Sequence, residues 1–368
     1  MRAKAKKILV IGGAGYVGCV VVDELLRRGY AVRVFDRLIY GDSGLREVRD
    51  RVEVVTGDMR AMDQAVFDDV AAVINLGGLS NDPTAEFNPD ANYQMNTVAT
   101  EVSAKQAKQA GVERYIFASS CSIYDQGVED PDADLILDED SEVSPRAAYS
   151  SSKYEGEQRL LPMADQNFCP VVLRKGTVYG WSPRMRFDLV VNTFLKDALT
   201  CGKITIHYGG EMWRPMVEVR DAARAYIACV EADEDKVRGQ VFNVMFRNMR
   251  ISELALRVKG ALAEQGVAVE IDAAYGYTGV RNYRVSGRKI ANVLDFRAVV
   301  TIEESVANAL SKLKGITIAE LENPRHYNIR WLKFLEEAEG VLGATGSLWG
   351  IPAKSDTKTE GVRTIRSV

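Results

Sequence analysis

The feature that most constrains this 368-residue chain is a glycine-rich turn between an apolar run and an amphipathic segment. Lys7–Ile11 is rich in β-branched residues and predicts a strand, and 15–28 has apolar residues at helical spacing. The turn carries Gly12, Gly15 and Gly18. Glycines there permit a tight turn, let backbone amides approach a pyrophosphate, and let the helix pack closely on the strand. The sequence therefore predicts a strand–turn–helix unit that suits a dinucleotide.

Strands and helices alternate through the first half of the chain. We expect further strands at 31–35, 52–55, 71–76, 114–118 and 171–174, and a helix at 96–110 that ends at Gly111. Strands that alternate with helices favour a parallel sheet covered on both faces. The predicted fold class is therefore α/β, with a Rossmann-type, doubly wound parallel sheet.

An acidic residue ends the second expected strand. Asp36 lies 18 positions after Gly18, where a carboxylate can accept hydrogen bonds from a ribose 2′-hydroxyl and would repel a 2′-phosphate. This position favours NAD over NADP. Arg37 follows directly and could accommodate a phosphate, so NADP stays open.

Two further positions suit a dinucleotide. Asp58, followed by Met59, comes after the third strand, where a carboxylate could accept from the adenine amino group. Leu76 and Gly77 come after the fourth strand, where the backbone must pass close to the cofactor.

The alternation loosens beyond about residue 175, which predicts two domains. We expect a NAD-binding Rossmann domain at 1–175 and a smaller, mostly C-terminal α/β substrate domain at 176–340, with segments that return to the first domain. Residues 346–368 have little apolar periodicity and predict a flexible tail.

The inventory of residues excludes several functions. The net charge of −4 gives no basic excess, so no nucleic-acid partner is expected. No stretch approaches the roughly 20 apolar residues that span a bilayer, and the N-terminus builds no signal peptide, so we expect a cytoplasmic protein without a membrane partner. Five scattered cysteines lack CxxC pairs and predict reduced thiols. With only His207 and His326, neither a metal site nor a Ser–His–Asp triad is expected.

A tyrosine and a lysine lie one helical turn apart in a YxxxK motif, Tyr149 and Lys153. A free tyrosine has a pKa of about 10, but a nearby ammonium and a positive nicotinamide ring would favour the phenolate. Ser120 ends the fifth strand, at the sheet edge where ligands sit, and can hydrogen-bond the substrate oxygen that exchanges the proton. The YxxxK spacing alone is common on helix surfaces, so the order of motifs carries the interpretation.

The order of these motifs along the chain resembles that of the extended short-chain dehydrogenase/reductases. The motifs are the glycine-rich turn, the acids after the second and third strands, Ser120 and YxxxK. Residues 6 to about 314 more closely resemble the NAD-dependent epimerase/dehydratase family, which includes UDP-glucose 4-epimerase. The resemblance implies NAD as cofactor and Ser120, Tyr149 and Lys153 as catalytic residues. The expected cofactor-binding residues are Gly12, Gly15, Tyr16, Val17, Gly18, Asp36, Asp58, Met59, Leu76, Gly77, Asn96, Tyr149 and Lys153.

The resemblance also implies a nucleoside-diphosphate sugar as substrate. The segment 213–217 matches the family's arginine motif, which makes Arg214 a diphosphate contact, with Arg281 and Arg284 as further candidates. Tyr208 falls where relatives stack an aromatic ring on the base. The expected substrate-binding residues are Ser80, Cys121, Ser122, Asn192, Tyr208, Arg214 and Arg281.

Departures from the family pattern narrow the reaction. Dehydratases place Asp-Glu after the catalytic Ser or Thr, decarboxylases keep a Glu at the second position, and 3,5-epimerases have a Cys there; this chain has Cys121-Ser122. The leading expectation is a C4 epimerase that oxidises the sugar to a 4-keto form and reduces it again. Asp125 replaces a usual glycine and Glu218 a frequent histidine, so the sugar stays open.

Alternatives stay open at this point. In the same class are an NAD(P)-dependent keto-sugar reductase and a 4,6-dehydratase with unusual acids. In another class is a non-catalytic dinucleotide-binding protein, which the intact Ser120, Tyr149 and Lys153 disfavour. A membrane-anchored sterol-type oxidoreductase is disfavoured by the lack of an anchor. The resemblance further implies a homodimer formed through helices 96–110 and 149–161.

Overall fold

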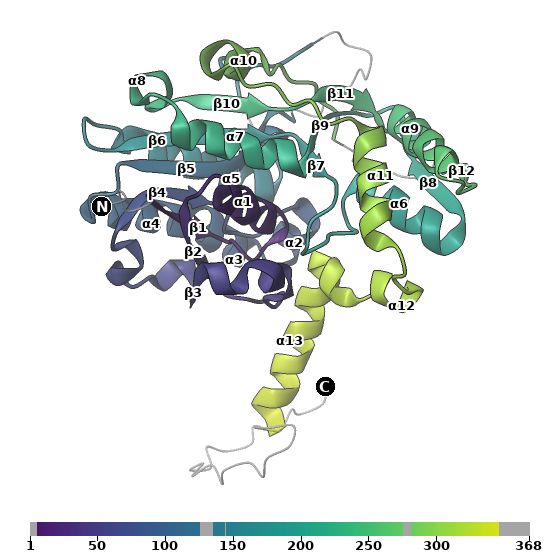
Figure 1. Cartoon of the computed structure of the whole chain (residues 1–368), viewed down its shortest axis with the longest axis horizontal. Coiled ribbons are helices and arrows are strands. Elements are labelled where there is room, and N and C mark those ends of the chain that lie inside the picture. The colour runs from purple at the N-terminus through teal and green to yellow at the C-terminus, as the bar shows by residue number, and fades with distance from the viewer. Residues whose placement is uncertain (1–5, 126–134, 144, 275–280, 346–368) are drawn as a thin grey trace, which may run out of the picture.

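A computed structural model describes residues 6–125, 135–143, 145–274 and 281–345, and its centre is a seven-stranded parallel sheet (Figure 1). The strand order is β10-β6-β5-β4-β1-β2-β3. The strands are β1 (Lys7–Ile11), β2 (Ala31–Asp36), β3 (Val52–Thr56), β4 (Val70–Asn75), β5 (Arg114–Ser120), β6 (Cys169–Lys175) and β10 (Val241–Val244). The doubly wound α/β class is confirmed, because the order reverses direction between β1 and β4.

Apolar residues on both faces of the strands explain why the sheet is covered twice. Ile8 and Val10 of β1 join the core formed with α1 and α7, whereas Leu9 and Ile11 join the core formed with α4 and α5. These helices are α1 (Tyr16–Arg27), α4 (Ala99–Gln109), α5 (Ala148–Leu160) and α7 (Val219–Glu231). The alternation of side chains along one strand therefore builds two cores.

The six predicted strands of this sheet are confirmed, and two features differ from the expectation. The segment expected as one helix at 96–110 begins with a π-helical turn at Gln94–Val98, and α4 starts after it. The seventh strand, β10, is not among the predicted strands, because four residues are too few to show the alternating apolar pattern of a strand.

The later part of the chain builds smaller sheets and packs back on the first one. β7 (Thr177–Tyr179), β9 (Trp213–Glu218) and β11 (Arg247–Arg250) form one sheet, and β8 (Lys203–His207) pairs with β12 (Glu270–Ala274). The remaining helices are α2 (Asp82–Phe87), α3 (Pro89–Tyr93), α6 (Val190–Cys201), α8 (Glu234–Val237), α9 (Ile251–Glu264), α10 (Arg288–Leu294), α11 (Ile302–Leu313), α12 (Ile318–Leu321) and α13 (Asn328–Thr345).

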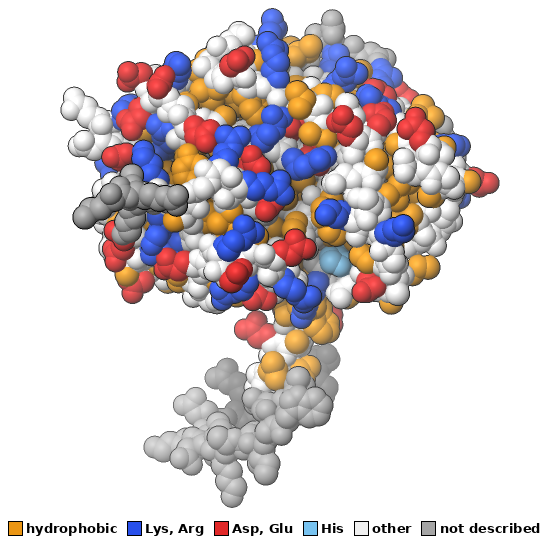
Figure 2. Space-filling view, viewed as in Figure 1, with side chains coloured by type: hydrophobic (Ala, Val, Ile, Leu, Met, Phe, Trp, Pro, Cys, Tyr) orange, Lys and Arg blue, Asp and Glu red, His pale blue; other side chains and the backbone are white. Residues whose placement is uncertain are grey.

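Domain boundaries at 1–175 and 176–340 stay a prediction, since two elements of the later part belong to the first layer structure. Strand β10 joins the first sheet, and helix α7 packs on it. The expected flexible tail, 346–368, lies outside the described residues. On the face seen in Figure 2, basic and acidic side chains are interspersed. Within the described ranges, no helix combines the length and apolar character needed to cross a membrane.

The turn between β1 and α1 depends on two glycines. Gly12 has φ +75°, and a Cβ there would lie 2.9 Å from the backbone nitrogen of Gly77. A Cβ at Gly18 would lie 2.2 Å from the carbonyl oxygen of Gly12. Since both obstacles are backbone atoms, a larger residue cannot be accommodated by a side-chain shift.

We expect Gly18→Ala to destabilise the fold by about 1–3 kcal/mol or more, because α1 must move away from the turn. Gly260→Ala on α9 is the matched control: no atom lies within 4 Å of its Cβ, so it should stabilise by about 0.5–1 kcal/mol. Urea unfolding measures both. Equal effects of the two substitutions would contradict the close packing at Gly18.

Candidate functional site

A cavity of about 330 Å³ opens at the carboxyl ends of the strands, where the strand order reverses. It collects most of the residues that the sequence assigns to the cofactor, the substrate and the chemistry. Those that line it are Gly12, Gly15, Tyr16, Val17, Gly18, Asp36, Met59, Leu76, Gly77, Ser80, Ser120, Ser122, Tyr149, Lys153 and Arg281. Their roles stay predictions, but the fold brings them to one place.

Asp36 connects the glycine-rich turn to the end of β2. Its carboxylate accepts hydrogen bonds from the backbone N–H of Ala14 (3.0 Å) and of Leu38 (2.8 Å). Burial raises its pKa, and these two hydrogen bonds and Arg184 oppose the rise. The narrow glycine cradle and this carboxylate together fit a dinucleotide whose ribose reaches Asp36.

Asp58 and Asn96 do not line the cavity, although the sequence expects both at the cofactor. The guanidinium of Arg60 donates to Asp58 at 2.6 and 2.9 Å and, with Arg37, holds the pKa of that carboxyl at about 2. Asn96 is buried in the π-helical turn, and its amide donates to the carbonyl of Leu79 (3.0 Å). Its Oδ1 has no hydrogen-bond partner among the described residues. Asn96 therefore shapes the loop after β4 from behind.

The catalytic candidates come from two neighbouring elements. Ser120 ends β5, and Tyr149 and Lys153 lie one turn apart at the start of α5. The Ser120 hydroxyl donates to the Ser122 hydroxyl at 2.9 Å, and Ser120 and Tyr149 both line the cavity. A hydroxyl and a phenol beside the same cavity can bind and deprotonate a substrate hydroxyl.

The charge environment of Tyr149 differs from the expectation. Burial raises the pKa of the phenol, and the groups that oppose this rise are Arg281, Ser120 and Arg186. The sequence assigns to Lys153 the task of lowering the pKa of this phenol. Burial and the neighbouring Lys175 lower the pKa of Lys153 itself to about 7, so this lysine carries less charge than an ordinary one. Without a ligand, this site therefore holds a protonated phenol beside a weakly basic lysine.

Lys175 is a pocket residue that the sequence reasoning missed. It ends β6, donates from Nζ to the carbonyl of Ser119 at 2.9 Å, and has a pKa lowered by burial to about 8. Its place at the carboxyl end of a strand was the available signal. Arg184 and Arg186 also line the cavity, and the crowding of arginine and aromatic residues at 179–187 could have indicated them. Asn328 had no comparable signal.

A buried ion pair fixes the two strands that carry the site. Arg174 of β6 binds Glu157 of α5 at 2.7 Å, and the two side chains are 5% and 0% exposed. Glu157 also accepts from Ser119, the residue before Ser120, and Arg174 donates to the Tyr124 hydroxyl at 2.6 Å. Because an unpaired buried charge is very costly, this pair holds β5, β6 and α5 in one arrangement.

Two expected substrate residues face away from the cavity. Cys121 is fully buried, with Sγ 3.0 Å from the carbonyl of Arg174, because the 3₁₀ turn at Cys121–Tyr124 rotates it inward; its expected contact is not found. Asn192 is buried as well and donates to the Tyr16 hydroxyl (3.1 Å) and to the Arg186 carbonyl (2.9 Å). Asn192 therefore supports pocket residues from behind.

Of the three arginines expected at a diphosphate, Arg281 lines the cavity. Arg281 forms an ion pair with Asp82 and lies 3.7 Å from Asp125. Arg214 donates to the carbonyl of Arg281, so it stands directly behind it and does not line the cavity. Arg284 lies over the ring of Trp213, away from the cavity, and the side chain of Tyr208 is outside the described part of the structure.

Among the described residues, no His, Cys, Asp or Glu cluster is placed to hold a metal ion.

The lowered pKa of Lys153 predicts a pH-dependent stability. Between about pH 7 and 10 the unfolded chain binds a proton at this lysine that the folded chain has released, because an unfolded lysine has a pKa of about 10.4. The free energy of unfolding of the wild type, relative to Lys153→Met, should therefore rise by about 1.4 kcal/mol per pH unit over this range and stay constant below it. Urea unfolding of the empty proteins at several pH values measures it; a difference independent of pH would contradict the assignment.

Known proteins are similar to this chain in sequence, and solved structures are similar to it in fold. A family model described as the NAD dependent epimerase/dehydratase family matches residues 8–244. Sterol-4-alpha-carboxylate 3-dehydrogenase, decarboxylating, from Mus musculus is 28% identical over 247 residues, which are 66% of this chain and 64% of that protein. The putative UDP-glucose 4-epimerase of Methanocaldococcus jannaschii is 25% identical over 316 residues, 84% of this chain and 98% of that one.

A solved structure extends the likeness to the whole fold. UDP-glucuronic acid 4-epimerase from Bacillus cereus, in complex with UDP-glucuronic acid and NAD, has a TM-score of 0.73 and 21% identity. It covers 84% of this chain, and this chain covers 100% of it. This chain is therefore longer than that relative.

Proposed function

Since this chain belongs to the NAD-dependent epimerase/dehydratase family, we propose that it is an NAD-dependent nucleotide-sugar epimerase acting at C4. The observation that carries the proposal is that Ser120 and Tyr149 both line the cavity, while the two residues after Ser120 are an inward-facing cysteine and a serine in place of acids. The pair suits transfer of one hydroxyl proton. Oxidation and re-reduction at one carbon need no additional carbon acid.

The protein's own groups divide the proton transfer between them. Ser120 holds the C4 oxygen by a hydrogen bond, and Tyr149 takes the hydroxyl proton when the sugar is oxidised and returns it on reduction. NAD, held by the glycine-rich turn and Asp36, would supply the acceptor and donor of the hydride for this carbon, and its positive ring would favour the phenolate. Lys153, one turn behind the phenol, stabilises that anion when it carries its proton.

The arginines at the outer end supply the place for a nucleoside diphosphate. Arg281 lines the cavity and Arg214 stands behind it, so their two positive charges can hold a diphosphate between the base and the sugar. The M. jannaschii relative is described as a UDP-glucose 4-epimerase, and the B. cereus enzyme was solved with UDP-glucuronic acid. We therefore propose a UDP-sugar as the substrate.

One observation keeps a second candidate reaction in view. Asp82 lines the cavity and is ion-paired with Arg281, and burial raises its pKa. A carboxylic acid at this position could serve a 4,6-dehydration, for which Ser122 offers no acid. Asp82→Asn separates the two reactions, since it should leave epimerisation measurable and abolish dehydration.

We expect Tyr149→Phe to lower kcat by about 10²–10⁴-fold while NAD still binds, because only the proton-transfer group is lost. Tyr154→Phe, on the same helix, is the matched control and should keep its activity. The assay follows a panel of UDP-sugars by mass spectrometry and NMR in deuterated water without added NADH. Deuterium entering C5 would contradict C4 epimerisation. So would a product that forms only in a parallel reaction with added NADH, in proportion to the NADH consumed.

We also propose a homodimer formed through α4 and α5. Arg159 of α5 binds Glu101 of α4 and Glu155 at 2.7 Å each, which orders this partly exposed face. A mass in solution near twice the 40.7 kDa of the chain is expected from sedimentation equilibrium, and a monomer mass would contradict the dimer. A cytoplasmic location stays a prediction of the sequence.

A further inference from the structure

A segment near the C-terminus crosses the cofactor side of the cavity. Residues 323–331, called here the C-terminal clamp, comprise the 3₁₀ turn Pro324–His326 and the first turn of α13. Beyond the clamp, α13 leaves the body of the molecule (Figure 1). The clamp lies well past residue 244, where the match to the family model ends, and nothing so far gives it a role.

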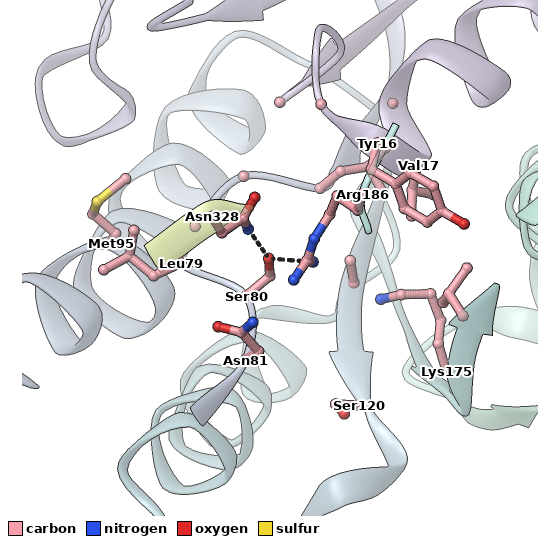
Figure 3. A pocket seen from close by; sticks show the side chains of 18 of the residues that line it. Tyr16, Val17, Leu79, Ser80, Asn81, Met95, Ser120, Lys175, Arg186 and Asn328 are labelled. Carbon is pink, nitrogen blue, oxygen red and sulfur yellow. Dashed lines mark hydrogen bonds between the residues drawn. The ribbon is translucent and has the colours of Figure 1, made fainter. Parts of the chain in front are cut away.

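Asn328 is the clamp residue that lines the cavity, and it is 4% exposed. Its side-chain amide donates to the Ser80 hydroxyl (3.2 Å), its Oδ1 accepts from the Arg184 guanidinium (2.6 Å), and its backbone N–H donates to Asp188 (3.1 Å). Figure 3 shows Asn328 and Arg186 on either side of Ser80, both hydrogen-bonded to it. One side chain thus joins the loop after β4 to the 184–188 segment.

Trp331 joins the clamp to a third loop. Its indole N–H donates to the carbonyl of Ile39 at 2.7 Å, in the loop that follows Asp36 at the end of β2. The guanidinium of Arg325 lies 4.9 Å from the centre of the indole ring. Ile39 lines the cavity as well, so this hydrogen bond fixes the wall beside the ribose-binding carboxylate.

The clamp also sets the positions of two buried cations. Arg184 and Arg186 both line the cavity and are 6% exposed, and Arg186 forms a two-point ion pair with Asp188 at 2.8 and 3.0 Å. Figure 3 shows Arg186 close to Tyr16 and Val17, at the start of α1, where the pyrophosphate of a dinucleotide binds. Because Asn328 is uncharged, it orients Arg184 without neutralising the charge that an anion would meet.

We propose that the C-terminal clamp closes the cofactor pocket by fastening the three loops around it, with Asn328 and Trp331 as positioning residues that slow the release of the dinucleotide. This proposal rests on the family's use of NAD and is independent of which carbon of which sugar reacts. It gives an epimerase a means of retaining its cofactor between turnovers. Its residues act on the dinucleotide through Ser80, Arg184 and the loop after β2.

Cofactor release tests the proposal directly. The full-length protein is loaded with NADH and mixed with excess NAD, and the loss of bound NADH fluorescence gives the release rate. Trp331→Phe removes the hydrogen bond of the indole N–H and keeps an aromatic ring at this position, so release should quicken about 3- to 10-fold. Asn328→Ala removes the two side-chain hydrogen bonds, to Ser80 and from Arg184, so release should quicken by about 10-fold or more. Glu336→Gln, at an exposed position farther along α13, is the control and should release NADH at the wild-type rate.

The outcomes are distinct. Faster release in Trp331→Phe and Asn328→Ala, with thermal unfolding of the empty proteins unchanged within a few degrees, supports the clamp. If Asn328→Ala does not fold, Trp331→Phe decides alone, because it preserves the packing of the ring. Wild-type release rates in both variants would overturn the proposal, as would equally fast release in Glu336→Gln. If both variants release NADH faster as expected but the wild type does not epimerise a UDP-sugar at C4, the result counts against the proposed reaction and supports the clamp.

Discussion

Burial of ionisable groups at the start of α5 and the end of β6 is the constraint on which this site depends. Tyr149, Lys153 and Lys175 lie together at the cavity, and burial raises the pKa of the phenol while it lowers the pKa of both lysines. The phenol in the empty site is consequently a poor base. On the proposed function, it becomes reactive only when the cofactor fills the cavity, which links chemistry to cofactor binding.

Such a site needs a frame that cannot relax. The buried ion pair of Glu157 and Arg174, with Ser119 bonded to the same carboxylate, holds together α5, β5 and β6, the elements that carry the proposed catalytic residues. On the other side, the contact between Gly12 and Gly18 fixes where α1 begins and therefore where its amides point. Both contacts are made by backbone atoms or buried side chains, so the elements that they join cannot shift to relieve a change there.

The sequence predicts the fold well, and most of the residues that it assigns to the site line one cavity, for a physical reason. Gly18, Asp36 and Tyr149 sit in local patterns whose geometry is set within a few residues, so spacing alone places them. Cys121 does not line the cavity, because a single 3₁₀ turn that the spacing does not reveal places it in the core. Asn328 could not be foreseen, because its role depends on chain segments more than 100 residues apart in sequence meeting at one hydroxyl. Long-range contacts of this kind leave no periodic signal.

The central claim is that the phenol of Tyr149 becomes a usable base only in the loaded pocket. The direct measurement is a spectrophotometric titration of the phenolate, taken as the difference between the wild type and Tyr149→Phe, without and with saturating NAD. We predict that the empty protein ionises this phenol only above the ordinary tyrosine pKa, and that NAD moves the transition toward neutral pH. The same transition pH in both states would contradict the account.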